Sequence, residues 1–553
     1  MQKPGGLLQY GQFAGVFLGL LLLGIAILAA SGAWLSALTG YPDEAAHYVT
    51  GLMVHQYLAG GDWRHPVSFA ENYYLHYPKV AIGHWPPFFY AVMAAWMLLA
   101  GTSSQSVLLL QPVLMALTGA LLFSALRNRA GPLWAGLAAV CLLLLPACQQ
   151  SSTQIMSEPL LALLTLLSAL AVLRYLETGS ASSLAWYSLP CFLAIMTKGS
   201  GLALVGLPVA AAVFSFRFEK LRAWRICIAA GAPVLAAAPW FVFTWRMASN
   251  GMDSGGPAPA LMLRRAAEAA RLFFPLLSPA LAVLALAAIA FLAVAAFRKD
   301  RRQDPLAGVA AAVSVLTFAF HSVSPTGMEP RRLMMAIPCL LALAALAGSW
   351  IENRLGVRWP RLPRRLAPGL VAALFLLTFP GVFEKPGRAL RQFYLSEVSP
   401  RLKPGFAVLV AGEVAENVIT AETAQRSPRP NLFVVRASKL VSDSDWSGLD
   451  YRLRLATRED VARALDEVPV NLVVIESGGA KGRSYKPDHD VRLVAEALRQ
   501  PGSPWVLAAA GRVDAGTAGP SALQVYVRNP PLANPVRLRV SLQRSLGRDL
   551  ARE

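Results

Sequence analysis

The amino-acid sequence predicts a polytopic α-helical membrane protein followed by a small soluble α/β domain. Three observations support this fold class. The 553-residue chain is 55% hydrophobic, above the roughly 45–50% of soluble domains, and its mean hydropathy is +0.46. Its apolar residues are concentrated in blocks of roughly 17–25 residues, which is the length that crosses about 30 Å of hydrocarbon. From residue 400 onward, short β-branched runs alternate with helical patterns instead.

The first apolar block runs from Phe13 to Leu38. Lys3, the apolar core and the sequence Ala29-Ala30-Ser31 give it some features of a signal peptide. However, the block is longer than a signal-peptide core of about 7–15 residues. We therefore expect an uncleaved first membrane span.

The stretch from 39 to 86 is polar and rich in Tyr and Trp, residues that favour the membrane–water interface. An acidic pair, Asp43 and Glu44, follows directly on the first span. Carboxylates at a membrane boundary are costly and are usually kept for function. The pair therefore indicates chemistry on a lipid-borne substrate at the outer face of a bilayer, with 39–86 as an outer catalytic loop.

Further apolar blocks are expected to span the membrane. They lie at about 87–101, 105–126, 132–148, 158–176, 184–197, 200–216, 226–243, 279–297, 306–322, 331–349 and 366–383. Block 87–101 is the shortest and begins beside Pro86 and Pro87, so we expect a partial or re-entrant element there. This assignment leaves about eleven full crossings and places the C-terminus outside.

The formal net charge of +19 comes from basic clusters between the apolar blocks. The clusters comprise Arg127, Arg129, Arg217, Lys220, Arg222, Arg225, Arg298, Lys299, Arg301, Arg302, Arg354, Arg358, Arg361, Arg364 and Arg365. Alternate connectors carry them, as the positive-inside rule requires, so we do not expect nucleic-acid binding. The five cysteines lie in or beside apolar blocks without paired spacing, which argues against a disulfide framework or a zinc site.

The C-terminal part, residues 399–553, is predicted to be an extracytoplasmic α/β domain with a mainly parallel sheet. Strands are expected at 406–412, 431–436, 470–476 and 505–510, with an edge strand at 524–528 and helices at 458–468 and 490–500. The first strand is not followed by a glycine-rich phosphate loop. We therefore expect this domain to act as a cap or recognition domain and give it no catalytic role.

A set of landmarks occurs in a fixed order over roughly residues 10–350. The set is Asp43-Glu44-Ala45, Gly61-Asp62-Trp63, His84-Trp85-Pro86-Pro87-Phe88, Ser157-Glu158-Pro159-Leu160, Thr197-Lys198-Gly199 and Glu329-Pro330-Arg331-Arg332. In this order it resembles the GT-C glycosyltransferases of the protein O-mannosyltransferase and aminoarabinose (lipid A) transferase type. Aminoarabinose transferases carry Glu-Lys before the two prolines, where this chain has His84-Trp85.

The resemblance implies a GT-C type fold with about 11–13 spans, comprising residues 1–398. It also implies an enzyme that takes a sugar from a polyprenyl-phosphate donor and passes it to a lipid, glycan or protein acceptor at the outer face. The expected location is a bacterial-type cytoplasmic (inner) membrane.

Three carboxylates are candidates for catalysis. Sugar transfer needs a carboxylate that orients or deprotonates the acceptor, and by resemblance Asp43 is the general base, with Glu44 beside it. Glu158 could bind a divalent metal together with Asp43, or hold the acceptor. Helix capping is the alternative for Asp43 and Glu158, since Asp43 precedes Ala-Ala-His-Tyr and Glu158 precedes Pro159.

Basic and aromatic residues are candidates for substrate binding. Cations must stabilise a prenyl-phosphate leaving group, and Lys198, Arg331 and Arg332 are expected on the outer side, where such residues are scarce. Lys79 could contact phosphate or sugar, His84 could bind a diphosphate or a metal, and Tyr48 could stack on a sugar. Snorkelling or interfacial anchoring is the alternative reading for these side chains. Trp85 and His47 are further candidates.

Two other functional classes stay open. A transporter or lipid-handling scaffold would explain the apolar blocks and the charges, although the sequence has no paired broken-helix repeats. A structural partner that has kept the fold and lost activity is the second. No cofactor is required by the sequence, no metal-ligand spacing demands a cation, and the sugar and the acceptor are undetermined.

Overall fold

The computed structural model describes residues 6–39, 42–61, 63–221, 223–249, 259–297, 304–324, 328–359, 365–427, 430–443, 451–478, 488–514, 520–542 and 547–552. Asp62 of the Gly61-Asp62-Trp63 landmark lies outside these residues. So do several members of the basic clusters: Arg222, Arg298, Lys299, Arg301, Arg302, Arg361 and Arg364.

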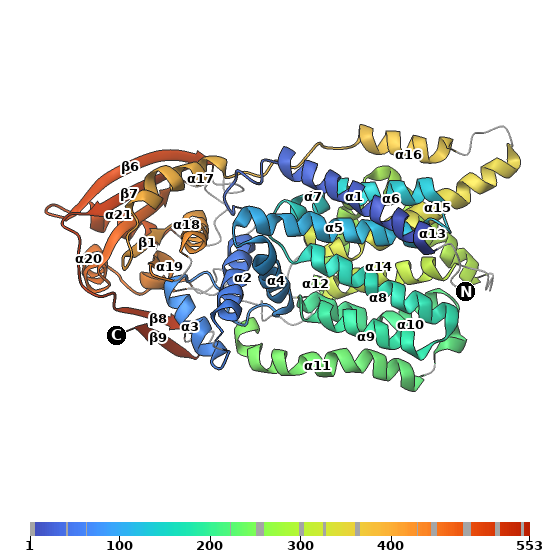
Figure 1. Cartoon of the computed structure of the whole chain (residues 1–553), viewed down its shortest axis with the longest axis horizontal. Coiled ribbons are helices and arrows are strands. Elements are labelled where there is room, and N and C mark those ends of the chain that lie inside the picture. Colours follow the sequence, from blue (N-terminus) through green and yellow to red (C-terminus); the bar gives the residue numbers. More distant parts are fainter. Residues whose placement is uncertain are drawn as a thin grey trace.

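Most of the chain forms a helical bundle along the long axis of the molecule (Figure 1). Its elements are α1 (Gly6–Ala30), α5 (Ser104–Leu126), α6 (Pro132–Leu144), α7 (Pro146–Ser152), α8 (Glu158–Thr178), α9 (Ala181–Ile195), η1 (Gly199–Gly206), α10 (Leu207–Phe214), η2 (Phe218–Lys220), α11 (Ala223–Ser249), α12 (Pro259–Leu277), α13 (Pro279–Phe297), α14 (Pro305–Val323), η3 (Pro330–Met335), α15 (Ile337–Arg358) and α16 (Leu366–Leu377). The chain is therefore a multi-pass membrane protein, as predicted.

Five of the described helices are each long and apolar enough to cross a membrane: α1, α5, α8, α11 and α14. The block predicted at 132–148 is bent by 58° between α6 and α7, because Pro146 cannot continue the ladder of the preceding helix. If this pair is one span, it is the sixth. Other predicted spans are shorter apolar helices of 10–17 residues, including α9 and α16.

Between the bundle and the C-terminal domain lie α2 (Pro42–Gly60), α3 (Pro66–His76) and α4 (Phe88–Ala100). In Figure 1, α2 and α4 run across the direction of the bundle helices, and the two pack on each other. At 13 residues, α4 is about 20 Å long, too short for a full crossing. Its length and direction agree with the partial element expected at 87–101.

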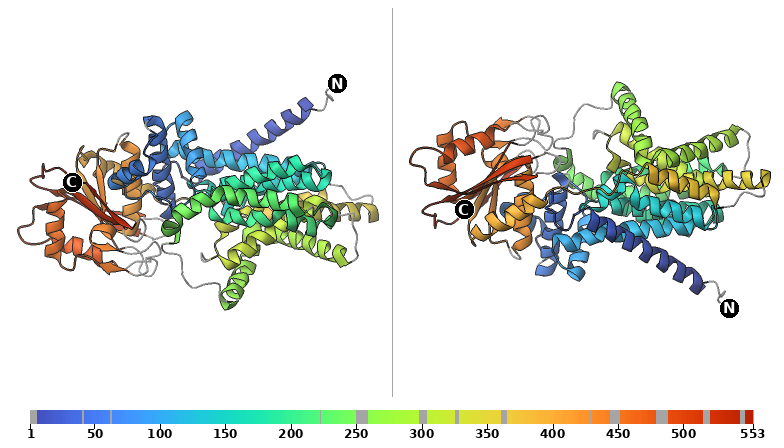
Figure 2. Two further views of the ribbon diagram at one scale, coloured as in Figure 1. Left: turned by 90° about the horizontal axis from the view of Figure 1, so that it is seen from below. Right: turned by 90° about the horizontal axis from the view of Figure 1, so that it is seen from above.

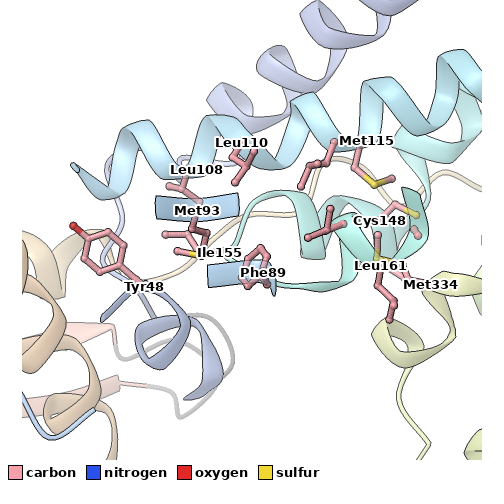
Figure 3. Packing of buried hydrophobic residues seen from close by; sticks show 14 of the residues in the cluster. Tyr48, Phe89, Met93, Leu108, Leu110, Met115, Cys148, Ile155, Leu161 and Met334 are labelled. Atoms are coloured by element: carbon pink, nitrogen blue, oxygen red, sulfur yellow. The ribbon is translucent and has the colours of Figure 1, made fainter. Parts of the chain in front are cut away.

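We call α2, α3 and α4 the crossing layer. Buried apolar side chains join it to the bundle. Figure 3 shows Phe89 and Met93 of α4 close to Leu108 of α5 and to Ile155, which precedes α8. All four belong to one buried cluster. Helix α4, on which α2 packs, is thereby held against α5 and the segment that leads into α8.

The C-terminal domain is α/β, as predicted. Its elements are α17 (Arg388–Phe393), η4 (Tyr394–Val398), η5 (Ser399–Arg401), β1 (Ala407–Ala411), α18 (Glu413–Arg426), β2 (Phe433–Arg436), α19 (Ala437–Leu440), β3 (Ser442–Asp443), β4 (Arg452–Leu453), α20 (Arg458–Glu467), β5 (Val470–Ser477), α21 (His489–Leu498), β6 (Trp505–Asp514), β7 (Pro520–Arg528), β8 (Leu538–Leu542) and β9 (Arg548–Arg552). The two further views show the sheet with the C-terminus beside it, far from the N-terminus (Figure 2).

Two details of the predicted sheet are wrong. The strand order is β2-β1-β5-β7-β6, so β7, expected at an edge, lies inside the sheet and β6 is at the edge. The sheet is mixed, because β1 pairs in parallel with β2 and β5, whereas β7 pairs antiparallel with β5 and β6. The link between β6 and β7 is too short for the crossover that parallel neighbours need.

Candidate active site

Asp43 and Glu44 lie in the first turn of α2. Neighbouring residues of an α-helix point about 100° apart, and these two side chains take different partners. An oxygen of Asp43 lies 2.9 Å from Nη1 of Arg331. Glu44 is fully buried, 2.5 Å from Nζ of Lys385, and also accepts a hydrogen bond from the backbone N–H of Ile155.

Arg331 is held from two sides. It lies in η3, which starts at Pro330, and its Nε donates to Glu329 over 2.6 Å while Nη1 reaches Asp43. Arg332 donates to the other oxygen of Glu329 over 2.9 Å. The Glu329-Pro330-Arg331-Arg332 landmark therefore forms one hydrogen-bonded unit beside the start of α2.

A second ion pair joins Glu158 and Lys198. Their side chains are 2.7 Å apart, and Glu158 is 1% exposed whereas Lys198 is 23% exposed. Glu158 lies in the first turn of α8, where the helix dipole favours a carboxylate. Lys198 has an extended backbone between α9 and η1. Here Gly201 packs so closely on α9 that a Cβ would lie 2.4 Å from the backbone of Ala194.

These residues act as one site because their charges influence each other. We call Asp43, Glu158, Lys198, Glu329, Arg331 and Arg332 the ionic cluster. Burial alone would raise the pKa of Asp43, but the charge of Arg331 beside it, assisted by that of Lys198, lowers it to about 2. Lys198 and Arg331 are also the basic residues that act most strongly on Glu158. Asp43 is therefore ionised at neutral pH.

Aromatic and imidazole rings border the ionic cluster. His47 lies one turn after Asp43 on α2, bonds Tyr90 through Nδ1 at 2.9 Å and has its ring 4.4 Å from that of Trp85. Burial lowers the pKa of His47 to about 4, so the ring is neutral. His84 meets Trp85 edge-on at 4.8 Å, and the charge of Asp43 acts on it. His84 therefore lies close to Asp43.

Three residues expected at the site, Glu44, Tyr48 and Lys79, have surroundings that differ from those of the ionic cluster. Glu44 is buried against Lys385, and Tyr48 is fully buried, its hydroxyl donating to the carbonyl of Thr102 over 2.6 Å. Figure 3 shows the ring of Tyr48 pointing away from Phe89, toward the C-terminal domain. Lys79 is partly buried in the loop after α3, and this loop is tied to α2 by a hydrogen bond from Ala81 to Thr50.

Asp43 and Glu158, the residues expected to share a divalent metal, have basic partners in this structure. Asp43 and Glu158 are each paired with a basic side chain rather than with each other. In the part of the chain that the structure describes, no group of three or more His, Cys, Asp or Glu could hold a metal ion. A divalent cation would have to displace Arg331 or Lys198 from these carboxylates.

Sequence reasoning missed two features of this region. The bridging role of Glu329 could have been inferred, because an acid beside two arginines in an outer loop needs a partner. Nothing in the sequence around Lys385 indicated that it would pair with Glu44. It lies beyond the last apolar block, where its backbone N–H bonds the carbonyl of Ser31.

No protein-family model matches the sequence, and no curated protein matches it either. Solved structures are similar in fold. ArnT from Cupriavidus metallidurans bound to undecaprenyl phosphate has a TM-score of 0.54 and 15% identity, over 92% of this chain and 98% of ArnT. ArnT in the apo state gives 0.53 over the same shares, also at 15% identity.

The Archaeoglobus fulgidus oligosaccharyltransferase, in complex with Zn and sulfate, has a TM-score of 0.47 and 13% identity. The alignment covers 82% of this chain and 67% of that chain. The likeness to ArnT establishes the fold and no more. The chain has the GT-C fold, as the ordered landmarks predicted.

Proposed function

We propose that this protein is a glycosyltransferase that moves a sugar from a polyprenyl-phosphate donor to a lipid, glycan or protein acceptor. The observation that carries the proposal is the ionic cluster. It gathers an ionised carboxylate, Asp43, its partner Arg331 and two further basic side chains, Lys198 and Arg332, at one end of an apolar bundle. The shared fold with ArnT, which was crystallised with undecaprenyl phosphate, supports this choice of donor.

The reaction is a direct displacement with inversion at the anomeric carbon. Asp43 orients the acceptor hydroxyl or amine and takes its proton as the nucleophile forms a bond to the anomeric carbon. The bond between this carbon and the phosphate oxygen breaks, and the oxygen leaves with the electron pair. Lys198, Arg331 and Arg332 stabilise the phosphate charge that develops.

The ion pairs also imply an order of events. A carboxylate with a pKa of about 2 is a weak base. An arriving phosphate competes for Arg331, and as this cation turns to the phosphate the pKa of Asp43 rises. Asp43 thus becomes a better base when the donor is bound.

Supporting roles follow from position. His84 and His47 border Asp43 on the side of Trp85, where the sugar or the acceptor would lie. Lys79 lies in the loop tied to α2, from which it would reach phosphate or sugar. Glu158 holds Lys198 in place. Glu44 and Tyr48 position α2 through buried contacts rather than by touching substrate.

We place the ionic cluster at the outer face of a bacterial-type inner membrane, with the C-terminal domain extracytoplasmic. The described basic residues between spans support this orientation. Arg127 follows the last turn of α5 and Arg358 ends α15, whereas the cluster lies near the opposite ends of these helices. By the positive-inside rule the arginine-rich end is cytoplasmic.

A transfer assay tests the proposal. Purified wild type, Asp43→Asn and the control Asp304→Asn are each given a panel of polyprenyl-phosphate sugars with membrane extract. Asp304 caps α14 at the end remote from the ionic cluster, and Asn caps equally well. We expect wild type and Asp304→Asn to consume one donor and Asp43→Asn to lose about 10²–10⁴-fold in rate. Binding of the lipid without consumption of any donor would instead favour a lipid-handling scaffold or a transporter.

A further inference from the structure

His321 is a buried polar side chain that the reaction described above does not use. It lies in the last turn of α14 and is 3% exposed. Helix α14 packs against η1, η3 and α8, the three elements that carry or adjoin Lys198, Arg332 and Glu158. The charges of these three residues act on the ring. His321 therefore faces the ionic cluster from a side that no sequence landmark covers.

The ring of His321 is poorly satisfied by the described residues. Within the described residues, neither Nδ1 nor Nε2 makes a hydrogen bond that meets normal geometry, although the backbone of Arg332 lies close. A neutral imidazole has one N–H donor and one acceptor nitrogen. Buried polar groups of this kind are nearly always satisfied, because leaving them unmade is costly. An external partner would account for the placement of His321.

The surroundings define the chemistry of that partner. Lys198 and Arg332 make the space beside the ring unfavourable for a cation and favourable for an anion. A ring N–H can donate to such an anion, and a phosphate oxygen accepts from several donors at once. Lys198 already bonds Glu158, so a further donor close by would add a contact to the phosphate that does not require this ion pair to separate.

We propose that His321 donates a hydrogen bond to a phosphate oxygen of the polyprenyl-phosphate substrate, beside Lys198. The inference rests on the proposed function and adds a residue to its phosphate site. His321 is a binding residue for the donor and for the leaving prenyl phosphate. It exchanges no proton with either.

The experiment measures lipid binding to the full-length protein in detergent. Undecaprenyl phosphate and the uncharged undecaprenol are titrated against wild type, His321→Leu, His321→Gln and Thr317→Val. Leu keeps the volume of the side chain without polar atoms, and Gln keeps a donor. Thr317 lies one turn before His321, is 1% exposed and bonds the Val313 carbonyl in its own helix, so it is a matched control.

We expect His321→Leu to bind undecaprenyl phosphate about tenfold to a hundredfold more weakly. Its affinity for undecaprenol and its melting temperature should match wild type, or the melting temperature should rise. Gln should restore part of the affinity, and Thr317→Val should bind as wild type does.

Two failures are distinguishable. If wild type binds undecaprenyl phosphate and His321→Leu binds it equally well, the role of His321 is refuted while the proposed function stands. If His321→Leu loses affinity equally for undecaprenyl phosphate and undecaprenol, the role of His321 is also refuted, since the ring would then affect only the binding of the lipid tail. If wild type binds undecaprenyl phosphate no better than undecaprenol, the phosphate site fails, and the proposed function fails with it.

Discussion

The contact between Asp43 and Arg331 gives this site its charge state. It joins residues 288 positions apart in the chain and keeps the carboxylate ionised well below neutral pH. Because kcat/KM reports the pKa values of the free enzyme, Asp43 cannot account for an acid limb in the kcat/KM profile of the wild type between pH 4 and 7. Activity of the wild type in that range should therefore be limited by other groups.

Replacing Arg331 by Gln should shift the acid limb of the kcat/KM profile upward by about one to three pH units. Burial raises the pKa of Asp43 and Arg331 lowers it, so without Arg331 the pKa rises. Below the new pKa the carboxyl is protonated and cannot accept a proton, so the rate falls as pH falls. The measurement is kcat/KM between pH 4 and 8, with each variant normalised to its own plateau.

The control for this profile is Arg332→Gln, because Arg332 pairs with Glu329 rather than with Asp43. This variant should weaken donor binding without shifting the acid limb of the kcat/KM profile. Superimposable profiles for wild type and Arg331→Gln would mean that Asp43 is not the group that must be ionised.

At this scale the sequence predicted residue types better than contacts. Asp43, Glu158, Lys198, Arg331 and Arg332 were all expected at the site, and the structure brings them together. The sequence could not distinguish the role of Asp43 from that of Glu44, because two adjacent acids in a first helical turn look alike until their distant partners are known. His321 was missed because a lone histidine in an apolar helix is usually a core residue.

Among the elements, the turn that carries Lys198 depends on a close approach of η1 to α9. Gly201→Ala should lower the melting temperature and weaken donor binding, because the new Cβ would lie 2.4–2.5 Å from backbone atoms of Ala194 and Ile195. Gly199→Ala is the matched control, since among the described residues beyond its immediate chain surroundings no heavy atom lies within 4 Å of its Cβ position. Thermal unfolding of both proteins in detergent tests this, and equal melting temperatures would contradict it.

The buried pair of Glu44 and Lys385 ties α2 to the segment after α16. Lys385→Met should cost about 3–5 kcal/mol, because it leaves a buried carboxylate without its cation. The double variant Glu44→Gln/Lys385→Met should regain most of that loss. Arg492→Met, which removes an exposed pair with Glu496, should cost about 1 kcal/mol or less. If Lys385→Met unfolds at the temperature of the wild type, the pair does not anchor α2.

Element types were predicted well, and their spatial order was not. The strand positions and the helices at 458–468 and 490–500 follow from local pattern, so all of them appear in the structure. The place of β7 inside the sheet depends on pairing between segments far apart in the chain. Local pattern carries no information on that pairing.

For the molecule as a whole, the C-terminal domain is docked on the crossing layer. His76 of α3 bonds the Leu432 carbonyl at 2.8 Å and stacks on Phe433 at 4.1 Å. Arg436 donates to the Pro78 carbonyl, and Arg548 pairs with Glu71. Since α2 contacts α18 directly, the domain supports the helix that carries Asp43.

Phe433→Ala should loosen this docking and lower the transfer rate, because it removes the ring on which His76 stacks. Hydrogen exchange should rise in residues 63–87 while binding of undecaprenyl phosphate is kept. Val506→Ala on the exposed face of β6 should change neither. Unaltered hydrogen exchange in Phe433→Ala would show that the C-terminal domain does not restrain residues 63–87.

The ionic cluster also has a consequence for selectivity against soluble anions. Its three carboxylates, Asp43, Glu158 and Glu329, balance its three cations, Lys198, Arg331 and Arg332. An inorganic anion that enters from water must separate an existing ion pair and gains little in return. A prenyl tail supplies about 0.8 kcal/mol for every CH₂ group it buries, enough to offset that separation. If the proposed function is right, the site should therefore discriminate against free phosphate and sulfate, because its ligand is selected by the lipid as much as by the charge.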